Sequence, residues 1–423
     1  MSRRFGRARS IALDVSPLRD SVAYRALWLG QVISLLGSNM RLVAVAVQVF
    51  DITGSTLAVG VVGLVEVVPL IVFSIVGGAI SDRSDRRAVI FRTQLGLMVT
   101  SLTLAYISFG SEPSVVWIYA LTAIASGLNA IDRPARAAMT PNLVSPDKLA
   151  AAMVLRQVVF QSTLILGPAL GGIMIASLGG AVEWVYLFDG LSFIAAIVAL
   201  RWVPRIVPKF DPGQSHLQSV REGMGFVFRN PLALSIFGID LIAMIFGMPR
   251  AVFPELAKET FRMGPEGVGL LFAAPSVGAL VAALTTGWVS RIRRQGLAVL
   301  WAVAAWGTAI TLAGFSVFSL VLTLVLLAVA GAADVVSAVF RSTMLQTTTP
   351  DALRGRISAF NLMVVTGGPR IGDFEAGLVG GIAGAPASIV LGGLACLAGT
   401  GALAVWSPSL TRYSTDESEA VSA

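Results

Sequence analysis

The chain has 423 residues, of which 55% are hydrophobic and only 13% are charged, and its formal net charge is +7. Soluble globular chains carry about 25% charged residues, so this composition excludes an ordinary water-soluble domain and favours a lipid bilayer as the surroundings. One cysteine and one histidine exclude an internal disulfide and a His/Cys metal cluster, so we expect no cofactor and no bound metal.

Long apolar runs follow one another along the whole chain. Only helices and closed barrels satisfy their backbone groups inside lipid, and these runs show no alternation of period two. We therefore predict an all-α membrane protein with twelve spanning helices. They are placed at 24–50, 56–80, 88–109, 115–138, 150–178, 184–203, 231–256, 265–290, 296–316, 318–346, 353–383 and 386–407.

The basic residues lie mainly in every second connection, which is the pattern that orients membrane proteins. If the N-terminus is cytoplasmic, the cytoplasmic side holds most of them, Arg133 and Arg136 included. The opposite side holds only Arg250, Lys258 and Arg262. This asymmetry predicts a multi-pass protein of a bacterial inner membrane with both termini in the cytoplasm. It also argues against nucleic acid as a partner, because the positive charge is spread over loops.

The longest connection, 204–230, divides the chain near its middle. Leu217, Val220, Met224 and Phe228 recur there at helical spacing, which predicts an amphipathic helix on the membrane surface. A plain polar linker is the alternative. Similar helix starts, "SPDKL" from Ser145 and "TPDAL" from Thr349, indicate a repeat. We predict an N-terminal bundle at 1–203, the linker at 204–230, a C-terminal bundle at 231–407 and a cytoplasmic tail at 408–423.

The stretch "GGAISDRSDRR", residues 77–87, concentrates charges between two apolar runs. Asp82 falls at the negative end of its own helix dipole and therefore needs a partner elsewhere. The start of the helix at 353–383, in the other half, is a candidate. We predict a latch between the halves, made by Gly78, Asp82, Arg83, Arg86 and Arg87. The alternative is that the arginines only orient the protein.

This stretch resembles the loop signature of the major facilitator superfamily, with Ile80 and Asp85 departing from the pattern. "GPALGG", residues 167–172, resembles a motif of the antiporter branch. "DRPARAAMTPNLV" and "MLQTTTPDALRGRI" are similar to segments of the enterobactin-exporter and macrolide-efflux group. The resemblance implies two six-helix bundles, alternating access and an ion gradient, usually of protons, as the driving force. The arginine that drug antiporters carry in the middle of the fourth helix is missing here.

Polar residues within the spans are costly in lipid and therefore mark cavities or partners. In the fifth helix Gly167, Pro168, Gly171 and Gly172 predict a bend or a tight contact, with a plain packing kink as the alternative. Two further groups of residues belong to the expected transport site. We expect proton coupling at Asp240, Asp334, Glu66 or Asp373, and a cavity lined by Asn39, Arg41, Arg156, Gln157, Arg370 and Glu375.

Some of these charges have another interpretation. Arg370 and Asp373 are three residues apart and are expected to form a static ion pair, as are Asp132 and Arg136, four apart. Asp240 has no cation on its own helix face, which favours a group that exchanges protons.

The predicted function is secondary export of small amphiphilic molecules, drug-like or siderophore-like, by proton antiport. The expected partners are the small-molecule substrate, protons and the lipid bilayer, and we expect a monomer. The alternatives are an importer of a polar solute and a membrane scaffold without transport. We do not expect an enzyme, because no nucleophile, metal set or catalytic dyad stands out.

Overall fold

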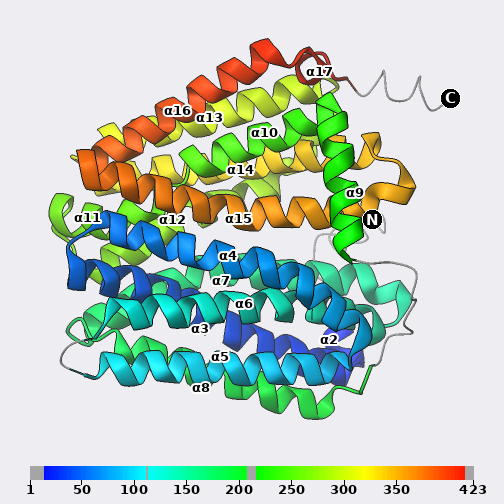
Figure 1. The fold of residues 1–423 in the computed structure, drawn as a ribbon, viewed down its shortest axis with the longest axis vertical. Helices are drawn as coiled ribbons and strands as arrows, with labels where there is room; N and C mark the ends of the chain where they lie inside the picture. Colours follow the sequence, from blue (N-terminus) through cyan, green and yellow to red (C-terminus); the bar gives the residue numbers. More distant parts are fainter. Residues whose placement is uncertain (1–13, 111–112, 207–215, 415–423) are drawn as a thin grey trace, which may run out of the picture.

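The computed structural model describes residues 14–110, 113–206 and 216–414. Within these ranges all regular secondary structure is helical, which confirms the predicted all-α class. Figure 1 shows long helices packed side by side, with α9 crossing them near one end. We call this the α9 end of the molecule, and the opposite end, where α11 lies, the α11 end.

The N-terminal half contains the helices that precede α9. Side-chain caps define where several of them begin: Ser21 Oγ accepts from the Tyr24 amide at 3.1 Å, and Ser55 Oγ accepts from the Ala58 amide at 3.3 Å. The elements are α2 (Ser16–Asp20), α3 (Val22–Thr53), α4 (Thr56–Arg83), α5 (Arg86–Ser108), α6 (Val115–Met139), η1 (Thr140–Asn142), η2 (Pro146–Lys148), α7 (Leu149–Ser177), α8 (Glu183–Ala199) and η3 (Leu200–Trp202).

The C-terminal half follows α9 (His216–Arg229), which packs on α15 and α10. Asn230 caps the next helix by accepting from two amides. The elements are α10 (Pro231–Phe246), η4 (Arg250–Val252), α11 (Phe253–Glu255), η5 (Leu256–Thr260), α12 (Pro265–Thr285), η6 (Thr286–Arg291), α13 (Gln295–Phe315), α14 (Leu320–Thr348), α15 (Asp351–Ala383), α16 (Ala385–Trp406) and α17 (Pro408–Thr411).

The span predicted at 231–256 lies within a helical segment, Pro231–Thr260, that is long and apolar enough to cross a membrane, but the helix in it is not continuous. It is broken between α10 and η4, at Gly247 and Pro249, where proline removes a backbone donor and fixes φ. The indole of Trp306 donates to the Gly247 carbonyl at 3.1 Å and satisfies an acceptor that the break leaves free. Because of the break, Arg250 does not continue the α10 helix.

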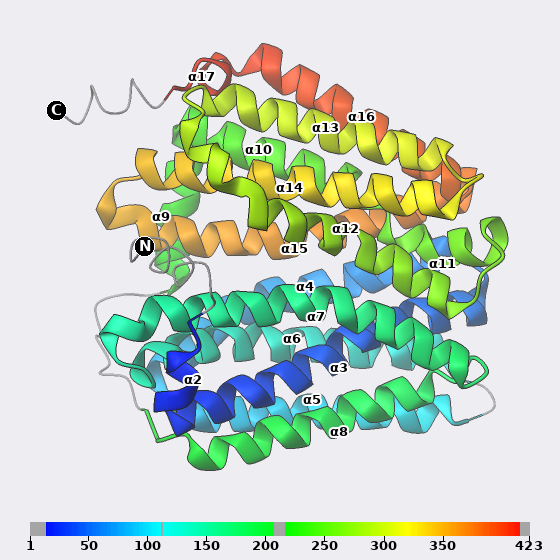
Figure 2. The ribbon, with the colours of Figure 1, turned by 180° about the vertical axis from the view of Figure 1, so that it is seen from behind.

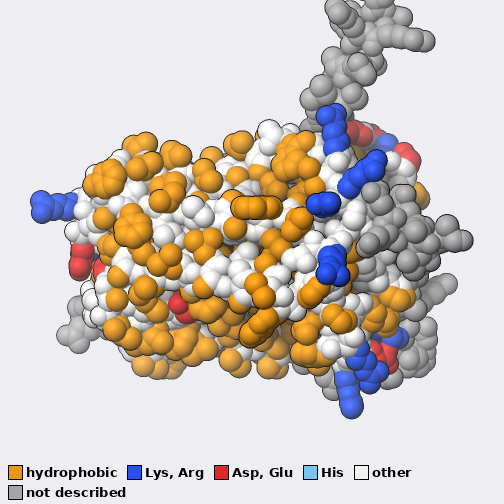
Figure 3. Space-filling model, turned by 90° about the horizontal axis from the view of Figure 1, so that it is seen from above, with side chains coloured by type: hydrophobic (Ala, Val, Ile, Leu, Met, Phe, Trp, Pro, Cys, Tyr) orange, Lys and Arg blue, Asp and Glu red, His pale blue; other side chains and the backbone are white. Residues whose placement is uncertain are grey.

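Eleven helical segments among the described residues are long and apolar enough to cross a membrane. The remaining predicted span, α15, carries Arg370, Asp373 and Glu375 in its interior, which lowers its hydropathy. It nevertheless runs alongside the other long helices through the body of the molecule (Figure 1). Figure 3 shows a broad apolar face whose Lys and Arg side chains gather mainly toward the α9 end, as a membrane-embedded body requires.

The two halves meet along two pairs of helices, α4 with α15 and α7 with α12. Figure 2 shows the second pair at the boundary between the halves. Glycines make both contacts close: a Cβ on Gly63 would lie 2.3 Å from the Arg370 carbonyl oxygen, and one on Gly172 would lie 2.4 Å from that of Pro265. The ion pair of Asp51 with Lys258, at 2.6 Å, joins the halves at the α11 end. These contacts bring the halves together toward that end.

Candidate functional site

A cavity of about 310 Å³ lies between the two halves, bounded by α3, α4, α6 and α7 on one side and by η4, α12 and α15 on the other. Its wall combines apolar side chains such as Phe160, Leu164 and Phe272 with an unusual number of polar ones. The polar lining consists of Ser38, Asn39, Arg41, Glu66, Thr122, Ser126, Asn129, Arg133, Arg250, Thr366, Arg370 and Asp373. A mixed wall of this kind suits a small molecule with apolar and polar parts.

An ion pair crosses the cavity from one half to the other. The Arg370 Nε of α15 lies 2.8 Å from the Glu66 carboxylate of α4. Arg370 also lies 3.8 Å from Asp373, one turn further along its own helix. The predicted Arg370–Asp373 pair is therefore present, but the shorter contact of Arg370 is with Glu66. A charge pair between the halves is a contact that any change in their separation must break.

Arg250 completes this network from the broken helix. Its Nε and Nη2 donate to the two Asp373 oxygens at 3.0 and 2.8 Å. The charge count placed Arg250 toward the far side of the membrane, and its side chain lies in the cavity wall, just after the break that follows α10. A bidentate arginine–carboxylate contact is both strong and orienting.

Arg41 was predicted to line the cavity and does so. Its ion-pair partner is a buried residue that does not line the cavity. The Arg41 Nε lies 3.1 Å from Asp189, a fully buried carboxylate of α8 that also accepts from Ser101 at 2.7 Å. Asp189 was not predicted as a site residue, although a carboxylate inside an apolar span is a recognisable signal. Asn39 also lines the cavity, as predicted.

A second charge cluster lies within the C-terminal half, away from the cavity lining. Arg341 of α14 lies 2.7 Å from Asp240 of α10 and 3.8 Å from Asp334 of its own helix. Asp240 was expected to have no cation on its own helix face, and α14 supplies one across the helix interface. Both proton-coupling candidates in this cluster are therefore held in an internal ion pair.

This cluster makes a testable prediction about stability. Arg341→Met should leave Asp240, which is 2% exposed, without a counter-charge and should cost about 3–5 kcal/mol of stability. Thermal unfolding of the purified protein measures the loss. The double variant Arg341→Met/Asp240→Leu should recover most of it, and an unfolding temperature of Arg341→Met equal to that of the unmodified protein would contradict the assignment.

The part of the predicted latch that the structure describes holds the N-terminal half together. Arg86 Nη1 donates to the Ala138 carbonyl at 2.7 Å, and Arg87 Nη1 donates to the Val203 carbonyl at 3.0 Å. These contacts join α5 to α6 and to the segment after α8. Gly78, Asp82 and Arg83 lie outside the residues that the structure describes in atomic detail, so the latch between the halves stays a prediction.

The glycines of the fifth predicted helix form two tight contacts on one continuous helix, α7. Gly167 faces Asn39 of α3, where a Cβ would lie 2.3 Å from the Asn39 Cβ. Gly171 faces the backbone of Met40, also on α3. Pro168 and Gly172 face α12, because a Cβ on Gly269 would lie 2.5 Å from the Pro168 carbonyl oxygen. The motif therefore packs α7 closely against α3 of its own half and against α12 of the other half.

Three predicted cavity residues are not among those that line the cavity: Arg156, Gln157 and Glu375. Gln157 is exposed and lies seven residues before Leu164, which places it on the same face of α7, beyond the lining toward the α9 end. Arg156 and Glu375 are partly buried.

Arg133 is a cavity residue that the sequence analysis assigned only to membrane orientation. Thr122, Ser126, Asn129 and Arg133 recur at helical spacing and give α6 a polar face toward the cavity. The neighbouring Asp132 points elsewhere and is paired with Arg136, as predicted, while accepting from Thr93 at 2.7 Å. The spacing of these four polar residues was the signal that could have revealed this face.

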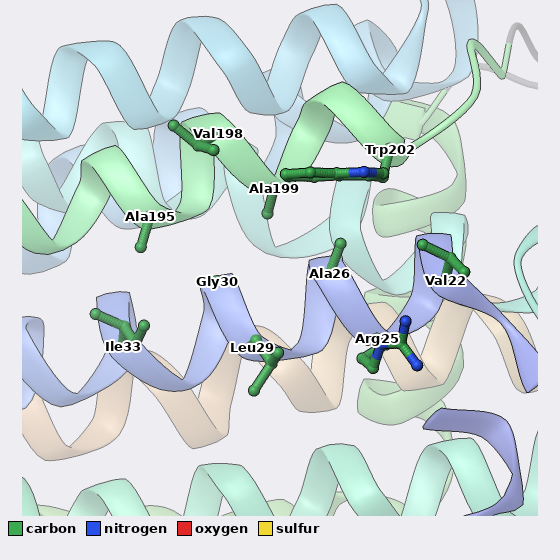
Figure 4. Close-up of a pocket in the computed structure, with 10 residues that line it drawn as sticks. All are labelled: Val22, Arg25, Ala26, Leu29, Gly30, Ile33, Ala195, Val198, Ala199 and Trp202. Carbon is green, nitrogen blue, oxygen red and sulfur yellow. The ribbon is translucent and has the colours of Figure 1, made fainter. Parts of the chain in front are cut away.

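A further groove, of about 460 Å³, lies on the outside of the N-terminal half between α3 and the end of α8. Figure 4 shows it between Ile33, Leu29 and Ala26 on one helix and Ala195, Ala199 and Trp202 on the other, with Arg25 near one end. Its wall is apolar apart from Arg25. It contains no residue of the ion pairs that join the halves, so the central cavity is the candidate site.

Comparison with known proteins agrees with this architecture. Residues 12–421 match the family described as transmembrane secretion effector. The chain is 30% identical over 378 residues to the enterobactin exporter EntS of Shigella boydii serotype 18, and the match covers 88% of each chain. The enterobactin exporter EntS of Escherichia coli O1:K1 / APEC is 30% identical over 377 residues, with the same coverage.

Solved transporter structures share the fold at low sequence identity. A bacterial homologue of the iron transporter ferroportin, in an inward-facing state, superposes with a TM-score of 0.69 at 15% identity, covering 91% of this chain and 98% of that one. The nucleoside transporter NupG also gives a TM-score of 0.69, at 14% identity, covering 92% of this chain and 99% of that one. At these identities the likeness concerns the fold alone.

Proposed function

We propose, because the chain belongs to the transmembrane secretion effector family of the major facilitator superfamily, that it exports small amphiphilic molecules from a bacterial cell by alternating access. The family consists of transporters and not of enzymes. The observation that carries the proposal is the central cavity, which lies between two halves that are in close contact toward the α11 end. Siderophore-like cargo is suggested by the relatives at 30% identity, and drug-like cargo by the mixed cavity wall.

The orientation follows from the charges. We place the α9 end, where most basic side chains gather, at the cytoplasm, with both termini on that side of the inner membrane. We propose that the cavity opens toward the cytoplasm, because the close contact of Gly172 with Pro265 lies on its other side. We propose that a monomer works in this way, with boundaries between the bundles at 203 and 231 and with α9 on the membrane surface.

We further propose that the transporter exchanges cargo for protons and that Glu66 carries the proton. Of the four predicted carboxylates, only Glu66 and Asp373 line the cavity. Asp373 is held by two hydrogen bonds from Arg250, whereas among the described residues Glu66 has an ion pair only with Arg370, across the two halves. A proton on Glu66 would remove the charge that holds Arg370 and would loosen the contact between α4 and α15.

The test is flux into everted membrane vesicles with and without a pH gradient. Vesicles with the unmodified protein should accumulate a fluorescent amphiphilic dye at least about tenfold faster with the gradient, whereas Glu66→Gln should transport at one slow rate in both conditions. Glu183→Gln, at the start of α8 and outside the cavity, is the matched control and should keep the gradient dependence. If Glu66→Gln still shows gradient-dependent flux, a residue other than Glu66 carries the proton, and Asp334→Asn is the next variant to test.

A further inference from the structure

The charges around the central cavity do not balance. Four arginines line it, and three of them have carboxylate partners: Arg41 with Asp189 at 3.1 Å, Arg250 with Asp373 at 2.8 Å, and Arg370 with Glu66 at 2.8 Å. The fourth, Arg133, forms neither a hydrogen bond nor an ion pair with any residue in the described ranges. Four positive charges thus face three negative ones.

Arg133 is directed into the cavity by its helix face. It is exposed there, one turn beyond Asn129 on the polar face of α6, and its charge interacts with those of Arg370, Asp132 and Glu66. Its neighbour Asp132 is occupied by Arg136, Thr93 and Gln94 on the side of α6 that faces α5. Because each nearby carboxylate already has a closer partner, Arg133 is available to a negative group from outside the protein.

Arg41 provides a second, independent observation. Its side chain is 11% exposed, and its ion pair with Asp189 is made through Nε, at 3.1 Å. Its Nη1 is buried without a hydrogen-bond partner among the described residues, although Arg41 lines the cavity. A buried guanidinium donor left without an acceptor is costly, and an acceptor on a bound molecule would satisfy it.

From these two arginines we infer that the cavity takes an anionic amphiphile, in which an acidic group such as a carboxylate, sulfonate or phenolate binds Arg133 and Arg41. The apolar part of the molecule packs against Phe160, Leu164 and Phe272. Charge-assisted hydrogen bonds to guanidinium groups provide the recognition. This inference rests on the proposed export function, because it takes the cavity to be the cargo site.

Binding of a matched pair of probes to the full-length protein tests the inference. The probes are anilinonaphthalene sulfonate and its uncharged parent, phenylnaphthylamine, titrated against protein in nanodiscs of phosphatidylcholine, a lipid without net charge. Arg133→Gln should weaken sulfonate binding about tenfold and change binding of the uncharged probe less than about twofold. Arg133→Lys should keep most of the affinity for the sulfonate.

The control is Arg92→Gln, an exposed arginine of α5 that does not line the cavity, and it should change neither probe. Equal binding of the sulfonate by Arg133→Gln and the unmodified protein, or failure of the unmodified protein to bind the sulfonate, would overturn the inference. Export in everted vesicles is measured separately. Export without preference for the anion contradicts this inference alone, and anion binding without export contradicts the proposed function alone.

Discussion

Gly172→Val is expected to reduce export about 100-fold while the protein still folds. A Cβ at this position would lie 2.4 Å from the Pro265 carbonyl oxygen and 3.1 Å from the Glu266 Cα, both in the backbone of the other half. Overpacking costs about 1–3 kcal/mol, and here the cost falls on the state in which α7 and α12 are in contact. That state would lose up to about 100-fold in population relative to one in which the α11 end is open.

Cysteine labelling measures this shift directly. A cysteine in place of Phe272, which lines the cavity, should react with a membrane-impermeant maleimide from outside the cell much faster in Gly172→Val than without that change. The native Cys396 is completely buried and contributes little background. Gly238→Val is the matched control, because a Cβ there would have 3.9 Å to its nearest neighbour, Leu403. Unchanged labelling with reduced export would rule out a role of this contact in access.

Arg370→Gln is expected to abolish export and to destabilise the protein by about 3–5 kcal/mol. The side chains of Arg370 and Glu66 are 24% and 15% exposed, so the change leaves a largely buried carboxylate without its cation. Asp373 keeps Arg250, which confines the damage to the contact between the halves. Thermal unfolding and dye export, measured on the same preparation, report the two effects.

A double-mutant cycle separates folding from transport. Glu66→Gln/Arg370→Gln replaces the ion pair with two amides and should recover most of the stability lost in Arg370→Gln, but not the export driven by a pH gradient. The coupling energy is the change in stability of the double variant minus the sum of the changes in the two single variants. It measures the contribution of the ion pair. Additive effects of the two single changes on stability would show that Glu66 and Arg370 do not interact.

Much of the helix order could be predicted from the sequence, because in lipid the length and hydropathy of a run decide whether it forms a spanning helix. The span at 231–256 was predicted without the break at Gly247 and Pro249, which interrupts a mostly apolar run. Mean hydropathy does not reveal a local break of this kind. The break leaves the Gly247 carbonyl without its helical donor, and the hydrogen bond that replaces it comes from Trp306, more than fifty residues away in the sequence.

The site was predicted less well than the helices. Residue types at membrane depth singled out Glu66, Arg370, Asp373, Asn39 and Arg41, and all of them line the cavity. Partnerships were harder to predict, because spacing along one helix reveals only neighbours three or four residues apart. Glu66 with Arg370 and Asp240 with Arg341 join different helices, and spacing along either helix shows neither pair.

The sequence by itself determined that this chain is a helical membrane protein and which of its residues are too polar to face lipid. Both conclusions depend on transfer of each side chain from water to hydrocarbon, a property of the residue and its near neighbours. Only the tertiary structure decided which charges neutralise one another, that Arg250 turns inward, and that Arg133 faces the cavity without a described partner. Electrostatic pairing depends on distances between helices, and the packing of glycines such as Gly63 and Gly172 sets those distances.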